Sequence, residues 1–97
     1  LAATEDLPTI RPYREAAWAE LPDGKSGDIA FSLPLLDAVH GRWHRFLTAL
    51  AAETFERAFL HPEIPGPVSL AKSVAMYAWH GRHHVAHIDT LPRRQGW

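Results

Sequence analysis

The chain has 97 residues, of which 46% are hydrophobic, and a formal net charge of -1 from 10 Lys+Arg and 11 Asp+Glu. This length suits one small domain of ordinary globular composition. There is no basic surplus to suggest a nucleic-acid partner, and the absence of cysteine excludes disulfides and thiolate metal ligands. No apolar run approaches the ~20 residues of a membrane span, and no signal peptide is visible, so we expect a cytoplasmic protein with no membrane partner.

The first third of the chain is expected to contain an extended stretch, a short helix and a loop. Residues 1–4 resemble the end of a helix and do not begin with Met, so we expect the chain to be incomplete at its N-terminus. Pro8 and Pro12 favour an extended stretch over residues 5–13. A short helix is predicted from Pro12 to about Leu21, followed by a loop over residues 22–28.

The first long helix is predicted from Ser32, as its N-cap, to about Ala51, with Pro34 in the first turn. Apolar side chains recur there at steps of three and four and should be mostly buried: Leu36, Val39, Trp43, Phe46, Leu47 and Leu50. His40 and His44 lie one turn apart on this helix. We interpret them first as structural or supporting groups.

The second long helix is predicted from Leu70 to about Leu91, with Ser69 as N-cap and Pro92 as its end. Before it, Thr54 is expected to cap a short turn that runs through Phe59. Three prolines and one glycine in residues 61–67 predict a rigid connection without regular structure. Two long helices and a short one predict an all-α fold.

Four of the seven histidines fall within eight positions of the second long helix: His80, His83, His84 and His87. Residues four apart share a helix face, so the pairs His80–His84 and His83–His87 can each point two imidazole nitrogens at one metal ion. On a helical wheel, His84 lies in the apolar stripe and His80 on its edge. We therefore expect these two to point best into a packed interior. A single histidine in this position would more often be a surface residue, but the density of four favours metal binding.

Four blocks of the sequence together resemble the DinB-like superfamily: residues 11–13 with 18–21, then 36–43, 59–63 and 77–88. The branch they resemble comprises the YfiT-type metal-dependent hydrolases, also described as bacillithiol transferases. The resemblance implies a four-helix bundle, of which this chain supplies the last two long helices and a short one. Residues 1–97 would then be the C-terminal part of one metal-binding domain whose N-terminal helices are missing.

The resemblance also implies a divalent metal, zinc or nickel, held by three histidines. Two of them match His80 and His84, and the third would lie on a helix ahead of the residue 11–13 block. His40, His83 and His87 are then expected to support the ligands. A ligating histidine usually donates its other ring N–H to a carboxylate, carbonyl or water. Glu20 and Glu63 are the weaker candidates for such a carboxylate.

Two kinds of chemistry follow from such a site. A metal with open positions activates water, which gives a hydrolase, or a thiol, which gives a low-molecular-weight thiol S-transferase. The substrate would accordingly be a hydrolysable compound or a bacillithiol-like thiol. The alternative is a non-catalytic metal-binding or dimerising bundle fragment, with a second copy of the chain as partner. Trp79 supports a homodimer, because it lies opposite the apolar stripe, where a monomer would expose it.

Overall fold

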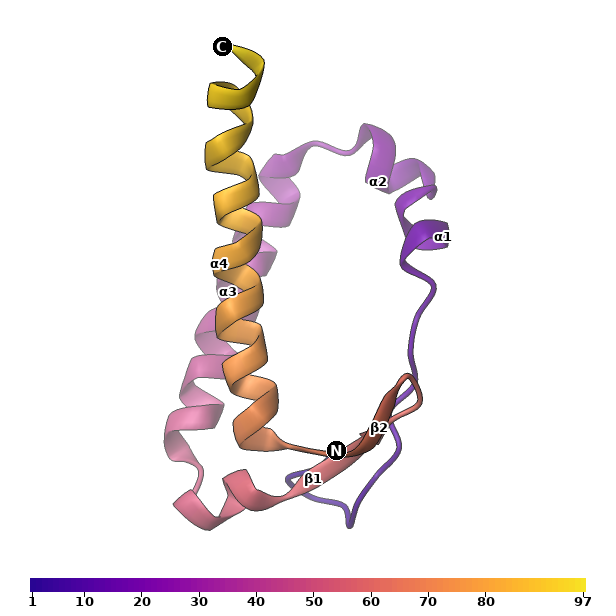
Figure 1. Cartoon of the computed structure of the whole chain (residues 1–97), viewed down its shortest axis with the longest axis vertical. Coiled ribbons are helices and arrows are strands. Elements are labelled where there is room, and N and C mark those ends of the chain that lie inside the picture. The colour runs from indigo at the N-terminus through magenta and orange to yellow at the C-terminus, as the bar shows by residue number, and fades with distance from the viewer. The chain divides into compact units, whose positions relative to one another are not determined.

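The computed structural model describes all residues from Leu1 to Trp97 and is mostly helical, as predicted. The chain divides into two compact units, which are described separately: Arg11–Ala52, and Leu1–Ile10 together with Glu53–Trp97. The α-helices and strands are labelled in Figure 1. In chain order the elements are α1 (Glu15–Ala19), α2 (Pro22–Ser26), α3 (Ile29–Ala49), a 3₁₀ turn (Ala52–Glu56), β1 (Ala58–His61), β2 (Ile64–Ser69) and α4 (Leu70–Gln95).

The unit of residues 11–52 contains one long helix and two single-turn helices. The helix predicted over residues 12–21 is shorter and forms α1. The loop predicted over residues 22–28 is wrong for most of its length, because α2 forms there with Pro22 in its first turn, where a missing N–H costs little. Ser26 Oγ donates to the Pro22 carbonyl at 2.9 Å, and Lys25 forms an ion pair with Glu20.

Helix α3 begins four residues earlier than predicted, and Ser32 is not its N-cap. Asp28 takes that position, and its Oδ1 accepts a hydrogen bond from the Ala30 N–H at 2.9 Å. An N-cap carboxylate satisfies one of the N–H groups left free in a first turn. Pro34 consequently lies inside the helix rather than in its first turn.

The predicted burial of the α3 apolar stripe is wrong in this structure. Leu36, Val39 and Phe46 are 56%, 55% and 47% exposed. The other three stripe residues, Trp43, Leu47 and Leu50, are only half-buried. Helices α1 and α2 have five residues each and are too short to cover a helix of 21 residues. The periodicity identified the apolar face of α3 but not whether another element covers it.

A β-hairpin forms where a connection without regular structure was predicted. Strands β1 and β2 pair antiparallel, with Phe59 opposite Val68 and Leu60 opposite Pro67. Because β2 is an edge strand, its prolines need not donate hydrogen bonds to a further strand. The register shifts between Leu60 and His61, opposite Pro65 and Gly66, and Gly66 has a φ of 78°. A positive φ suits glycine and accommodates the bulge.

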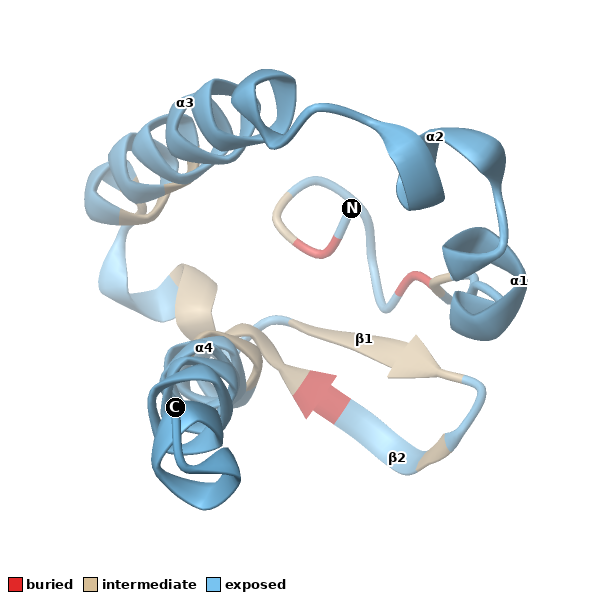
Figure 2. Ribbon diagram, turned by 90° about the horizontal axis from the view of Figure 1, so that it is seen from above, coloured by how far each residue is buried: buried red, intermediate tan, exposed pale blue.

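The N-terminal segment adds to the other edge of β1. Thr9 bridges Leu60 in parallel, the Ile10 N–H donates to the Leu60 carbonyl at 2.9 Å, and the Leu60 N–H donates to the Pro8 carbonyl at 2.9 Å. The small core of this unit lies here, with Val68 only 2% and Ala2 only 5% exposed. Figure 2 shows buried residues only on β2 and in this N-terminal segment, while most of each helix is exposed.

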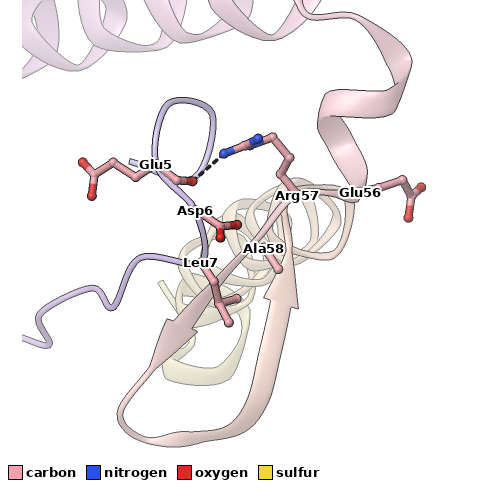
Figure 3. Close-up of a pocket in the computed structure, with 6 residues that line it drawn as sticks. All are labelled: Glu5, Asp6, Leu7, Glu56, Arg57 and Ala58. Carbon is pink, nitrogen blue, oxygen red and sulfur yellow. Dashed lines mark hydrogen bonds between the residues drawn. The ribbon is translucent and has the colours of Figure 1, made fainter.

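Arg57 joins three parts of this unit. Its guanidinium donates to the carbonyl oxygens of Ala2 and Glu5, and its own carbonyl accepts the Leu70 N–H at 2.8 Å. The same region contains a pocket of about 240 Å³, lined by Glu5, Asp6, Leu7, Glu56, Arg57 and Ala58 (Figure 3). Arg57 thereby holds the start of α4 against the hairpin and the N-terminal segment.

Helix α4 begins where predicted and ends later. Ser69 is its N-cap, and the Ser69 Oγ accepts the Lys72 N–H at 3.2 Å. Pro92 does not end the helix, which continues to Gln95 and stops at Gly96, in the left-handed conformation with a φ of 74°. Glycine is the usual residue for this helix end because it lacks a Cβ. No helix of the chain combines the length and apolarity that a membrane crossing requires.

Candidate metal site

Helix α4 brings its four histidines together on three successive turns, and all four are exposed. The expectation that His80 and His84 point into a packed interior is therefore wrong in this structure. Ring-to-ring geometry distinguishes the two pairs instead. Each ring lies closest to the ring one turn away, as the spacing predicted.

The pair His80–His84 is joined directly through its nitrogens. The two Nε2 atoms lie 2.8 Å apart, and the ring centroids 4.4 Å apart at an interplanar angle of 53°. This distance requires one Nε2 to carry a proton and the other to accept it. Two nitrogens that converge on one point are also what a chelated metal ion needs.

The separation of these two nitrogens fits shared metal ligation closely. At metal–nitrogen bonds of about 2.0–2.1 Å, two nitrogens lie roughly 2.9 Å apart at a right angle and roughly 3.4 Å apart at a tetrahedral angle. The observed 2.8 Å approaches the first value directly and the second after a small opening of the two exposed side chains. His80 and His84 therefore fit two positions of a divalent metal.

The pair His83–His87 has a different arrangement. Its ring centroids lie 4.2 Å apart at 63°, edge to face. Trp79 stacks on His83, with centroids 4.8 Å apart and planes 18° apart, and lies nearly parallel to His80 at 6.3 Å. We did not predict this stack from the sequence, although the spacing of Trp79 and His83, one turn apart, could have indicated it.

The rings around His83 lower the pKa of its imidazole from the ordinary value of 6.5. Partial desolvation by the surrounding side chains is the largest cause, and the nearby imidazoles of His87, His84 and His80 add to it by opposing a further positive charge. The neutral form of His83, the form that binds metals, is therefore favoured at neutral pH.

The other predicted supporting residues lie on different elements. His40 is exposed on α3, with its Nδ1 2.8 Å from the Leu36 carbonyl oxygen and its ring edge-on to Trp43. Glu20 pairs with Lys25, and Glu63 lies in the turn between β1 and β2, where its N–H donates to His61 Nδ1 at 3.1 Å. Their support of the ligands stays a prediction. The structure contains no group of three histidine, cysteine, aspartate or glutamate side chains arranged to hold a metal ion.

The chain is similar over its whole length to proteins named as metal-dependent hydrolases. YfiT of Bacillus subtilis is 46% identical over 97 residues, which are all of this chain and 54% of YfiT. A "Putative metal-dependent hydrolase" of Bacillus cereus strain B4264 is 50% identical over 97 residues, all of this chain and 55% of that protein. The chain thus spans about half the length of the curated relatives it matches.

The solved structure of YfiT superposes with a TM-score of 0.92 at 46% identity, covering 99% of this chain and 55% of YfiT. YfiT is described as "a probable metal-dependent hydrolase with an unusual four-helix bundle topology". The sequence profile of the DinB superfamily matches residues 1–88, which is most of the chain. This chain therefore belongs to the DinB superfamily.

Proposed function

We propose that this chain forms part of a metal-dependent hydrolase and that His80 and His84 supply two of its metal ligands. The convergence of their Nε2 atoms to 2.8 Å is the observation that carries the proposal. The names of the relatives support the metal-dependent chemistry, since two proteins that match the whole chain are named as metal-dependent hydrolases. An open catalytic site needs three protein ligands, so one further ligand must join this pair.

A divalent metal with open positions supplies a nucleophile at neutral pH by lowering the pKa of a bound water from 15.7 to about 7. The chain's own part is to hold and orient that metal. His80 and His84 bind as neutral imidazoles through Nε2, which leaves each Nδ1–H to donate to a carbonyl, carboxylate or water. Trp79 lies nearly parallel to His80, with ring centroids 6.3 Å apart.

Thiol S-transfer is the second candidate, because the same pair of ligands would serve a metal that deprotonates a coordinated thiol. The chain has no cysteine, so no thiol of its own would compete for the metal. A small thiol would then enter as a substrate. Zinc and nickel are both proposed, since imidazole suits both.

The test is metal binding to the protein carrying this sequence, measured by calorimetric titration with nickel and with zinc. We expect the tightest binding step to be lost in the double variant H80A/H84A and kept in H83A/H87A, a matched pair on the same helix. Retention of that step in H80A/H84A would overturn the assignment.

Turnover of ester or amide substrates by the metal-loaded protein, set against conjugation of a small thiol to an electrophile, separates the two chemistries. Metal binding without either activity would favour a non-catalytic bundle.

A further inference from the structure

The second histidine pair of α4 has free ring nitrogens. His83 and His87 lie one turn apart with ring centroids 4.2 Å apart, slightly closer than the 4.4 Å of His80 and His84. No hydrogen bond of the structure involves a ring nitrogen of either residue, whereas His80 and His84 bond to each other. Both side chains are exposed in this structure.

The two pairs are separate units rather than one cluster of four. The shortest ring distances between the pairs are 5.9 Å for His83–His84 and 6.0 Å for His84–His87, longer than either distance within a pair. Within each pair the rings also meet at a large angle, 63° for His83–His87 and 53° for His80–His84. Each imidazole therefore has one nearest imidazole, one helical turn away. His83 and His87 meet edge to face, so they chelate one ion once the exposed His87 ring rotates about its side-chain bonds.

Trp79 contacts the second pair by stacking on His83. Its indole stacks on one face of His83 at 4.8 Å, and stacking occupies the ring face while leaving the nitrogens at the ring edge accessible. A ring held in this way loses less rotational freedom when it binds, which lowers the entropic cost of ordering it. His83 is thus the better ordered member of its pair.

We propose that His83 and His87 form a second chelating site for a divalent transition metal, separate from the His80–His84 pair. Imidazole pairs favour borderline ions such as nickel, copper and zinc over magnesium and calcium, which take oxygen ligands. Two nitrogens leave the remaining coordination positions to water or to a small ligand from solution. The site is therefore weaker than one with three protein ligands and exchanges its ion more readily.

The test uses the H80A/H84A protein as the starting background, so that the first pair cannot contribute. Titration with nickel should show a residual binding step that disappears when H83A/H87A is added to this background, with helical content checked by circular dichroism. Substituting His87 alone should weaken that step at least ten-fold, because a chelate becomes a single ligand. A residual step unchanged by H83A/H87A, or no residual step in H80A/H84A, would overturn the proposal.

A measurement on the unsubstituted protein removes any dependence on the variants. Zinc, which is diamagnetic and acts only on nearby rings, should shift the ring-proton resonances of His83 and His87 when added beyond one equivalent, and the same amount of magnesium should leave them unchanged. Shifts at His80 and His84 without any at His83 and His87 would contradict the second site. These outcomes do not depend on the catalytic proposal, which H80A/H84A tests separately.

Discussion

The guanidinium of Arg57 donates from Nε to the carbonyl oxygen of Ala2, a residue 55 positions earlier in the sequence. Its Nη2 donates to the Glu5 carbonyl, as Figure 3 shows, and the backbone carbonyl of Arg57 accepts the first N–H of α4, from Leu70, at 2.8 Å. One residue therefore connects the N-terminal turn, the hairpin and the helix that carries the histidine pairs. Long-range contacts of this kind are not visible in a local pattern of residues.

Replacing Arg57 with alanine should destabilise this unit by about 1–3 kcal/mol, because two hydrogen bonds from a charged donor are lost. Lysine at this position should recover only part of the loss, since an ammonium group lacks the fork that reaches two carbonyls. Urea unfolding followed by circular dichroism measures the change. Arg42→Ala on exposed α3 is the control and should alter stability by less than about 0.5 kcal/mol. Equal effects of the two substitutions would contradict the role assigned to Arg57.

Val68 is the most buried residue of the chain, at 2% exposure, and faces Phe59 across the hairpin. Val68→Ala should cost roughly 1–3 kcal/mol through lost burial and a small cavity. Val85→Ala, at a position on α4 that is 56% exposed, makes the same chemical change and should cost under about 0.5 kcal/mol. Denaturant titration of both variants compares them. A similar loss at the two positions would place the core elsewhere.

The structure and the sequence pattern assign different N-cap residues to α3, Asp28 and Ser32, and mutation can distinguish them. Asp28 accepts the Ala30 N–H, so Asp28→Ala should cost about 0.5–2 kcal/mol of helix stability. Ser32 lies inside the helix, where alanine is the better helix former, so Ser32→Ala should be neutral or slightly stabilising. Amide hydrogen exchange over the first two turns of α3 distinguishes the two outcomes. Faster exchange in Ser32→Ala alone would restore Ser32 as the cap.

Sequence periodicity predicted the elements that local physics determines. The structure confirms both long helices and the Ser69 cap, which depend on residues close together in the sequence. It also brings together the histidine rings that lie one helical turn apart. The hairpin was not predicted because Pro65, Gly66 and Pro67 normally interrupt structure. They are tolerated here because β2 is an edge strand and because its bulge uses the positive φ of Gly66.

Burial could not be predicted in the same way, because it depends on which surfaces meet. The wheel placed His80 and His84 near an apolar stripe, but the rings are exposed, and their nitrogen-to-nitrogen contact is what supports them as ligands. The identity of the metal, the third ligand and a homodimer stay predictions. None of these follows from the spacing of residues on one helix.

The last prediction concerns the protonation of His83 in the metal-free protein. Partial desolvation, followed by the imidazoles of His87, His84 and His80, lowers the pKa of His83 below 6.5. Trp79 stacks on this ring at 4.8 Å and His87 lies at 4.2 Å, so Trp79→Ala and His87→Ala should each raise the pKa of His83 towards 6.5. His44→Ala, on the other long helix, is the control and should leave it unchanged. Ring-proton chemical shifts recorded against pH, with a chelator present, give the midpoint for each protein.

The sign of the effect on folding follows from proton linkage. The unfolded chain binds its proton at the ordinary pKa of 6.5, and the folded chain binds it only at lower pH. Below pH 6.5 the unfolded state therefore holds more protons, so the contribution of His83 to stability is fully present above pH 6.5 and is lost as the pH falls through its folded pKa. Restoring the ordinary pKa with His87→Ala should reduce this loss in acid. A His83 midpoint at or above 6.5 in the unsubstituted protein would show that the ring cluster does not favour the neutral imidazole, and the argument for His83 as a ready metal ligand would then rest on geometry alone.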